Sequence, residues 1–199
     1  MSGLTVPLSK TYDGNTTAIV SGTATLQTSE AAGTGNSLDG IPYAGDVVSI
    51  TGTPTGTYND ANVASAATVT FAGLSLTGAQ SVNYSLTIQS PQAATITKAN
   101  QTITGLPTTD TRNVGASDYS LTATAPGGVV TYISSDPSVA SISGSTVTIG
   151  AAGQTTITAS QAGNGNYNPA TDVYQTLTVT LAPVVVYQHN FETTTISSH

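Results

Sequence analysis

Lys10, Asp13 and Asn83 are the residue types that an intramolecular isopeptide bond requires. In that reaction the lysine amine attacks the asparagine carboxamide and ammonia leaves, while a nearby carboxylate promotes the proton transfers. Lys10 belongs to the first strand that the sequence predicts, Asp13 follows it, and Asn83 lies near the last strand of the same module. The alternative is that Lys10 is an exposed strand residue beside a turn aspartate and that Asn83 forms another turn.

Asp39, Asp46 and Asp60 are candidate ligands for Ca²⁺, because this cation prefers carboxylate and carbonyl oxygens. Asn59 and Asn62 add carboxamide oxygens beside Asp60. The spacing of these residues is not that of an EF-hand loop, and Asp and Asn are also common turn formers. The sequence therefore predicts no cofactor, with Ca²⁺ as the one candidate metal.

Side chains for catalysis are scarce. The two histidines, His189 and His199, both lie in the segment 183–199, and cysteine is absent. Neither a Ser-His-Asp triad nor a histidine pair for a metal can therefore form in the main part of the chain. The carboxylates show no clustered pair for acid–base chemistry. We predict that the protein is not an enzyme.

The composition favours β-structure. Hydrophobic residues make up 38% of the 199 residues and charged residues only 7%, whereas charged residues are about a quarter of an average chain. The hydrophobic residues alternate with Thr and Ser in short runs that Gly, Pro, Asn and Asp separate, which is the pattern of strands and turns. Helical periodicity is absent. The sequence therefore predicts an all-β fold of the sandwich type.

The charge balance restricts the partners. Three basic residues against ten acidic ones give a formal net charge of −7, which disfavours binding to nucleic acid and to anionic membranes. No run approaches the roughly 20 apolar residues of a membrane-spanning helix, so we predict no membrane insertion. The first residues do not resemble a signal peptide. If the protein is exported, we expect its targeting segment to lie elsewhere.

A boundary between two modules is predicted near residue 98. Ala94 and Ile96 alternate with threonines, as in a strand with one buried face, and a second short strand is predicted around Ile103. Only residues 98–100 separate these strands, a connection too short to act as a flexible tether. We therefore predict two tandem Ig-like β-sandwiches arranged end to end. The predicted domains are residues 1–98, residues 99–182 and a tail, residues 183–199, that begins a further, truncated domain. The alternative is a tail that folds back onto this protein or onto a neighbouring molecule.

The alternating pattern also predicts two separate cores of apolar residues. The predicted first core consists of Ile50, Val69, Phe71, Leu74, Leu76, Leu86 and Ile96. The predicted second core consists of Leu121, Val130, Tyr132, Val139, Ile142, Val147, Ile157, Leu177 and Val179.

Three motifs of the first module resemble the YDG repeat, a family close to the MBG domains. They are Lys-x-Tyr-Asp-Gly at residues 10–14, Gly-Asp-Val-Val-Ser-Ile at residues 45–50, and Leu-Ser-Leu-Thr-Gly-Ala with Asn-Tyr-Ser-Leu between residues 74 and 86. The resemblance covers the module except for a loop at residues 27–40. It implies tandem occurrence in large secreted bacterial proteins and adhesins, and it implies no catalytic residues.

The second module resembles bacterial Ig-like domains of group 2. The motifs are Ser-Ser-Asp-Pro-Ser-Val-Ala-Ser at residues 134–141 and Gly-x-x-Thr-Ile-Thr-Ala-Ser at residues 153–160. An Asn-rich run at residues 162–170 is similar to a variant found in secreted multidomain proteins. The resemblance implies an extracellular or bacterial cell-surface location.

These observations favour a structural function. We expect a monomeric spacer, or stalk, that extends a distal domain of a bacterial surface or secreted protein, with neighbouring domains of the same polypeptide as its partners. The alternative is a module that binds a glycan or a protein through the loops at one end of a sandwich.

Overall fold

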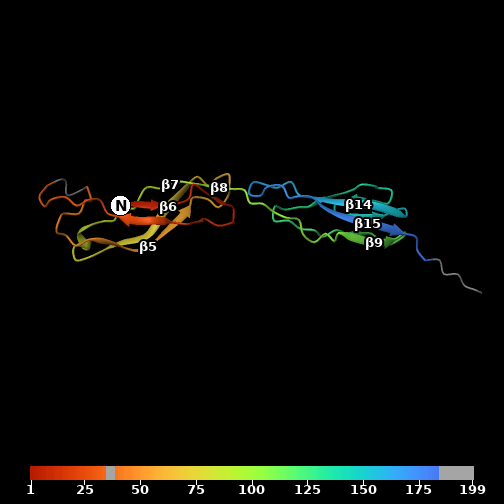
Figure 1. The fold of residues 1–199 in the computed structure, drawn as a ribbon, viewed down its shortest axis with the longest axis horizontal. Coiled ribbons are helices and arrows are strands. Elements are labelled where there is room, and N and C mark those ends of the chain that lie inside the picture. The colour runs from red at the N-terminus through yellow and green to blue at the C-terminus, as the bar shows by residue number, and fades with distance from the viewer. Residues whose placement is uncertain (35–38, 184–199) are drawn as a thin grey trace, which may run out of the picture. The chain divides into compact units, whose positions relative to one another are not determined.

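The structure of the chain, a computed structural model, describes residues 1–34 and 39–183 and consists mainly of β-strands and loops (Figure 1). The helical structure in these residues is a single 3-10 turn, η1 (Ser81–Asn83). The predicted all-β fold is therefore confirmed. Residues 184–199, which make up nearly all of the predicted tail and include both histidines, lie outside the described residues.

The described chain divides into two compact units that do not follow the sequence order strictly. The first unit contains Met1–Thr102 together with two later segments, Ala125–Gly128 and Ala162–Ala170. The second unit contains the rest of the described chain. The sequence did not predict that two later segments join the first unit. The predicted domain boundaries after residues 98 and 182 stay predictions.

The strands of the first unit form one four-stranded antiparallel sheet and two smaller pairs. The sheet has the order β3-β5-β6-β7, β1 pairs with β4 in antiparallel fashion, and β2 pairs with β8 in parallel. The strands of this unit are β1 (Ser2–Thr5), β2 (Ser9–Thr11), β3 (Thr17–Ala18), β4 (Ser21–Thr25), β5 (Ser49–Tyr58), β6 (Thr68–Thr77), β7 (Gln92–Ala93) and β8 (Thr95–Thr97).

The β5–β6 hairpin changes register beside two glycines, Gly52 of β5 and Gly73 of β6. The register shifts between Gly52 and Thr55, and both Gly52 and Gly73 have a positive φ, of 99° and 82°. A Cβ on Gly73 would lie 2.3 Å from the carbonyl oxygen of Thr53, and one on Gly52 would lie 2.3 Å from the carbonyl oxygen of Gly73. Glycine is required at both positions, because side chains fit neither the backbone conformation nor the space.

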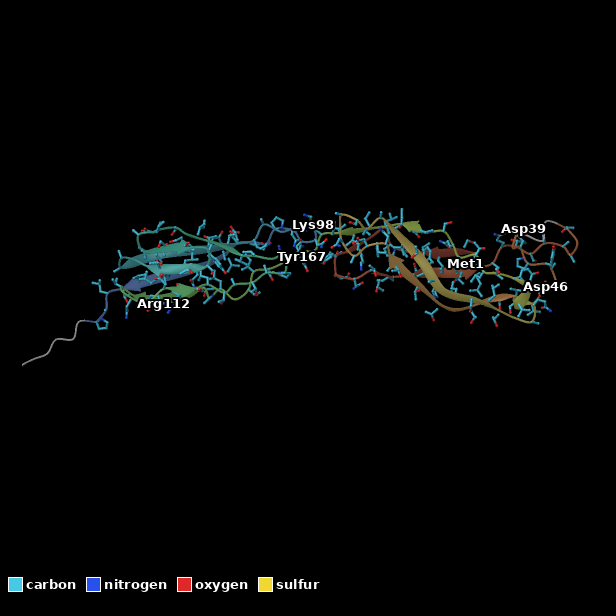
Figure 2. All side chains as sticks on the ribbon, turned by 180° about the vertical axis from the view of Figure 1, so that it is seen from behind. Met1, Asp39, Asp46, Lys98, Arg112 and Tyr167 are labelled. Carbon is cyan, nitrogen blue, oxygen red and sulfur yellow. The ribbon has the colours of Figure 1, made fainter. Side chains whose placement is uncertain are left out.

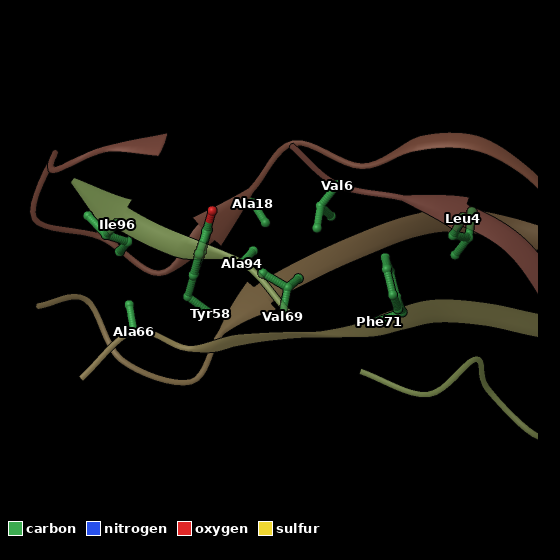
Figure 3. Close-up of a cluster of buried hydrophobic side chains, with 9 residues drawn as sticks. All are labelled: Leu4, Val6, Ala18, Tyr58, Ala66, Val69, Phe71, Ala94 and Ile96. Atoms are coloured by element: carbon green, nitrogen blue, oxygen red, sulfur yellow. The ribbon is translucent and has the colours of Figure 1, made fainter. Parts of the chain in front are cut away.

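The core of the first unit gathers side chains from most of its strands (Figure 3). Val69, Phe71 and Ile96 are buried as predicted. The alternation of β6 explains this result, because residues two apart on a strand face the same side. Six buried members of this core were not predicted: Leu4, Val6, Ala18, Tyr58, Ala66 and Ala94.

Four residues predicted for the first core are only half-buried. For the three that lie on β5 and β6, the reason is the short length of the neighbouring strands, because β3 covers β5 only at Thr17↔Thr57 and Ala18↔Gly56, and β7 covers β6 only near Thr68 and Val69. The other half of the β5–β6 hairpin has no further strand beside it in the described residues. The four residues are Ile50, Leu74, Leu76 and Leu86, of which Leu74 still packs against the core.

The second unit is a sandwich of two sheets. One sheet has the order β10-β13-β12 and the other the order β11-β14-β15-β9, and a single core takes side chains from both. Its strands are β9 (Thr109–Asn113), β10 (Tyr119–Ser120), β11 (Thr131–Ser134), β12 (Ala140–Ser143), β13 (Thr146–Ile149), β14 (Gly153–Ser160) and β15 (Val173–Thr180).

The predicted second core agrees closely with the structure, because β14 and β15 alternate regularly between buried and half-buried residues. Tyr132 and Ile142 are half-buried and pack against the core from outside. Ala140 and Ala159 are fully buried and were not predicted. The predicted residues that are buried are Leu121, Val130, Val139, Val147, Ile157, Leu177 and Val179.

Gly73→Ala tests the close approach of β5 and β6. We expect it to lower the free energy of unfolding of the first unit by more than the roughly 1 kcal/mol that a positive φ alone costs a non-glycine residue, because the new Cβ would also collide with Thr53. Urea unfolding followed by tyrosine fluorescence measures the loss. Gly33→Ala is the matched control, since Gly33 has a φ of 79° and nothing within 4 Å of its added Cβ. Equal losses in the two variants would contradict the steric argument.

Candidate functional site

The Lys10 ammonium is the centre of a hydrogen-bonded cluster in the β2–β3 connection. Lys10 Nζ donates to Asp13 Oδ1 at 2.7 Å, to the carbonyl oxygen of Asn15 at 2.8 Å and to Asn15 Oδ1 at 3.1 Å. It also donates to the carbonyl oxygen of Thr17 at 3.1 Å and lies 5.3 Å from the centre of the Tyr58 ring. The lysine of the Lys-x-Tyr-Asp-Gly motif thus closes the turn that follows β2.

The electrostatics of this cluster favour the charged form of Asp13. The hydrogen bond from Lys10, followed by the one from the Asn15 N–H, lowers the pKa of the Asp13 carboxyl below its usual value. Burial raises the pKa of the Tyr58 phenol, so this ring remains neutral beneath the ammonium. The Lys10 side chain is 18% exposed and that of Asp13 is 48% exposed, so water screens the pair in part.

The structure does not bring Asn83 to Lys10, so the predicted isopeptide bond is not supported. Lys10 lies near Tyr58, which ends β5, whereas η1, with Asn83, follows Thr77, which pairs with Ser49 at the beginning of β5. A strand of 10 residues separates the two sites by about 30 Å. Asp13 is also poorly suited to this chemistry, because its lowered pKa keeps it ionised beside a charged amine.

The three candidate calcium ligands bind protein groups, and Asp60 lies apart from the other two. Asp39 Oδ1 accepts the N–H of Ile41, and Asp60 Oδ1 accepts the N–H of Asn62 at 2.7 Å. Within the described residues no group of three or more His, Asp or Glu side chains could hold a metal ion. Asp60 shapes a loop at the opposite end of β5 from Asp39 and Asp46, which Figure 2 shows near one another at one end of the first unit.

A hollow of about 550 Å³ lies beside Asp39 and Asp46. Its wall includes Tyr43, Asn83 and Tyr84. Tyr84 is fixed by two hydrogen bonds, since its hydroxyl donates to Asp46 Oδ2 at 2.5 Å and accepts the N–H of Tyr43 at 3.1 Å. The bond with Asp46 raises the pKa of the Tyr84 phenol. Asn83 therefore belongs to this hollow and not to the Lys10 cluster.

Sequence reasoning missed the groups that hold Ala162–Ala170 in the first unit. Tyr12 and Tyr167 meet edge to face with ring centres 5.3 Å apart, and Ala99 forms a parallel β-bridge with Tyr167. Lys98 Nζ donates to the carbonyl oxygen of Asn164 at 2.6 Å, and Figure 2 shows Lys98 and Tyr167 next to each other. The dense spacing of Asn in residues 162–170 was the available signal, but an Asn-rich loop does not indicate what it contacts.

Comparison with known families bears on the first unit. The family model described as the YDG domain matches residues 2–95, which confirms the predicted YDG-type repeat in this part of the chain. No curated protein matches the chain. Among the described residues, no helix has the length and apolar character needed to cross a membrane.

Lys10→Met should raise the pKa of the Asp13 carboxyl toward its usual value near 3.9, because the hydrogen bond that stabilises the carboxylate is lost. Asp13 has a depressed pKa in the folded state, so its contribution to stability is present above the pKa of the unfolded chain and is lost as the pH falls through the folded-state pKa. An NMR titration of the side-chain carboxyl carbons measures the change. Asp136 is the internal control, since Ser138 lowers its pKa independently of Lys10. An Asp13 titration that is unchanged in Lys10→Met would contradict the assignment.

Proposed function

We propose that the chain is a pair of spacer modules from a bacterial cell-surface or secreted protein, and that these modules withstand tension between a distal domain and the cell. We further propose that the second unit is an Ig-like domain, as its two sheets and its motifs suggest. The proposal includes a monomeric state, an extracellular location, and neighbouring domains of the same polypeptide as partners. The observation that supports the proposal is that, in each unit, a strand near the beginning of its sequence pairs in parallel with a strand near the end.

In the first unit, β2 and β8 run parallel. Lys10 is paired with Ile96, and the main chain adds hydrogen bonds from Thr95 N to Leu8 O at 2.9 Å and from Tyr12 N to Thr97 O at 2.8 Å. β2 lies close to the beginning of the unit in the sequence, and β8 precedes the connection at residues 98–100. Tension along the chain therefore reaches this pair from opposite directions.

The second unit repeats the arrangement with strands from a different sequence. β9 is its first strand and β15 its last, and five residues of each pair in parallel, from Thr109 opposite Thr176 to Asn113 opposite Thr180. Two further bonds extend the pair, from Thr176 N to Thr108 O and from Val114 N to Thr180 O. The two units thus share this feature although their motifs differ.

Parallel pairing decides how such strands separate under tension. The chain enters the first strand at one end of the pair and leaves the last strand at the other end, so tension slides one strand along the other and loads all the hydrogen bonds together. Pulling at one end of a pair would instead break these bonds one after another. Simultaneous loading needs a larger force, and resistance to force is the property that a spacer between a cell and a distal domain requires.

A second candidate function is glycan binding at the hollow beside Tyr84. The hollow combines aromatic rings with uncharged and acidic hydrogen-bonding groups, which suits a neutral polyhydroxylated ligand. The fixed Tyr84 hydroxyl keeps one wall in place before binding. Tyr43 and Asn83 are the residues of this wall that can contact a sugar through a ring face and a carboxamide.

The direction of pulling tests the spacer function. Because the chain has no cysteine, pairs of cysteines can be introduced as attachment points for single-molecule force spectroscopy. We expect Thr109→Cys with Thr180→Cys, at opposite ends of the β9–β15 pair, to unfold at a force several-fold higher than Asn113→Cys with Thr180→Cys, at the same end. All three positions are exposed. Equal unfolding forces in the two geometries would remove the support for a spacer.

A glycan array with the whole chain tests the second candidate. We expect any reproducible binding to be lost in Tyr43→Ala and in Asn83→Ala, because both residues line the hollow. Leu181→Ala serves as the control, since Leu181 is exposed and belongs to the second unit. Binding that survives both substitutions, or no binding to any glycan, would exclude this site as a glycan receptor.

A further inference from the structure

The connection between β14 and β15 leaves the second unit and folds as part of the first. β14 ends at Ser160 and β15 begins at Val173, and Ala162–Ala170 between them belongs to the first unit. A connection between neighbouring antiparallel strands needs only two to five residues. The additional residues therefore serve a purpose other than joining the two strands.

The connection is preformed by its own hydrogen bonds. Asn164 Oδ1 accepts the N–H groups of Asn166 at 2.7 Å and Tyr167 at 2.9 Å, and the N–H of Asn164 donates to the carbonyl oxygen of Tyr167 at 3.0 Å. Gly163 has a φ of 77°, and a Cβ there would lie 2.6 Å from the same carbonyl oxygen. This closed turn holds the side chains of Asn166 and Tyr167 in fixed positions.

Both polar groups of the Asn166 carboxamide form hydrogen bonds with the loop that contains Asn62 and Val63. Its Oδ1 accepts the N–H of Val63 at 3.0 Å, and its Nδ2 donates to Asn62 Oδ1 at 2.8 Å. A carboxamide offers a donor and an acceptor side by side, whereas a carboxylate offers only acceptors. An aspartate at position 166 would keep the bond from Val63 and place a negative charge against Asn62 Oδ1.

The loop at residues 59–68, which contacts Asn166, is also held in its conformation by its own hydrogen bonds. Asp60 Oδ1 accepts the N–H and the Nδ2–H of Asn62, which turns Asn62 Oδ1 outward toward Asn166. Asn59 Oδ1 accepts the N–H groups of Ala67 and Thr68 and closes the other side of the loop. Of the side chains that resembled calcium ligands in the sequence, Asp60, Asn59 and Asn62 are therefore positioning residues for this contact.

The main chain of the first unit continues the contact as a short parallel bridge. Ala99 N donates to the carbonyl oxygen of Asn166 at 3.0 Å, and Asn168 N donates to the carbonyl oxygen of Ala99 at 2.9 Å. The edge of one tyrosine ring meets the face of the other where Tyr12 packs on Tyr167. The contact thus combines backbone pairing at Ala99, a carboxamide that both donates and accepts a hydrogen bond, and one pair of tyrosine rings.

We propose that this surface of the first unit, formed by Tyr12, Asn62, Val63 and Ala99, is a recognition site for an Asn-Gly-Asn-Tyr-Asn segment. The ligand class is an uncharged, turn-forming peptide segment rich in carboxamides, and in this chain residues 162–170, which fold as part of the first unit, supply it. The inference does not depend on the spacer function, because it concerns recognition and not resistance to force.

Amide hydrogen exchange of the whole chain tests the recognition site. In Asn166→Asp we expect the amides of Val63 and Ala99 to exchange roughly tenfold faster, because repulsion between the carboxylate and Asn62 Oδ1 replaces the bond from Nδ2 and favours opening of the whole contact by about 1.4 kcal/mol. The amides of Ile157 and Leu177 in the second unit should keep their rates, which shows that the variant is folded. Gly165→Ala is the matched control in the same connection, since nothing lies within 4 Å of its added Cβ and its φ is not positive.

A double-mutant cycle extends the test to the receiving side. Asn62→Ala and Asn166→Ala should each accelerate exchange at Val63, and the double variant should exchange no faster than the faster single variant, because both remove the same contact. Unchanged exchange in Asn166→Asp would overturn the proposal. It would also be overturned by equal acceleration in Gly165→Ala, or by additive effects in the cycle.

Discussion

The parallel pairing of strands near the beginning and end of each unit is the constraint from which much of the remaining structure follows. A chain that places β2 beside β8 in the same direction must leave β2 by a turn that does not form a hairpin with it. Lys10 supplies that turn by gathering Asp13, Asn15 and Thr17 around its ammonium. The strands β3 to β7, which lie between β2 and β8 in the sequence, pair in antiparallel fashion, and β4 pairs with β1. In the second unit, β9 and β15 also pair in parallel, so the chain cannot connect them by a hairpin. The strands β10 to β14, which lie between them in the sequence, form the rest of the sandwich.

Carboxamides and hydroxyls organise the loops of a chain that has few charges. The described residues contain two ion pairs, Lys10 with Asp13 and Arg112 with Asp110, and both are local. Several loops are closed instead by Asp or Asn side chains that accept N–H groups a few residues later, as Asp136 does from Ser138 and Asn164 from Asn166. In the second unit, the buried Thr155 hydroxyl contacts Ser134, Ser135 and the N–H of Asp136, which fixes the beginning of the Ser-Ser-Asp-Pro turn. Contacts of this kind depend little on salt and suit a protein with seven net negative charges.

The sequence predicted the fold class and most of the second core because period-2 alternation is a local signal. Ile157, Leu177 and Val179 alternate on long strands, and all three are buried. The same signal was misleading at Ile50, Leu74 and Leu76, since alternation does not show how far a neighbouring strand extends. The candidate sites were harder, because Asp and Asn have the same local pattern whether they bind a cation, close a turn or contact another segment. Asp60 closes a turn, and its neighbour Asn62 contacts Asn166, a pairing across 104 residues that no local pattern encodes.

The connection at residues 98–100 shows how the recognition of Ala162–Ala170 and the pairing of strands support each other. A short link between strands is stiff only if its backbone groups are held, and Ala99 is held on both sides by Asn166 and Asn168. Asn168 also donates to Asn100 Oδ1, and Lys98 binds the carbonyl oxygen of Asn164, so each residue of the link has a partner in the same segment. The chain that leaves β8 therefore continues as paired backbone and not as a free tether. If the chain acts as the proposed spacer, tension that passes through this link meets these hydrogen bonds before it can extend the chain.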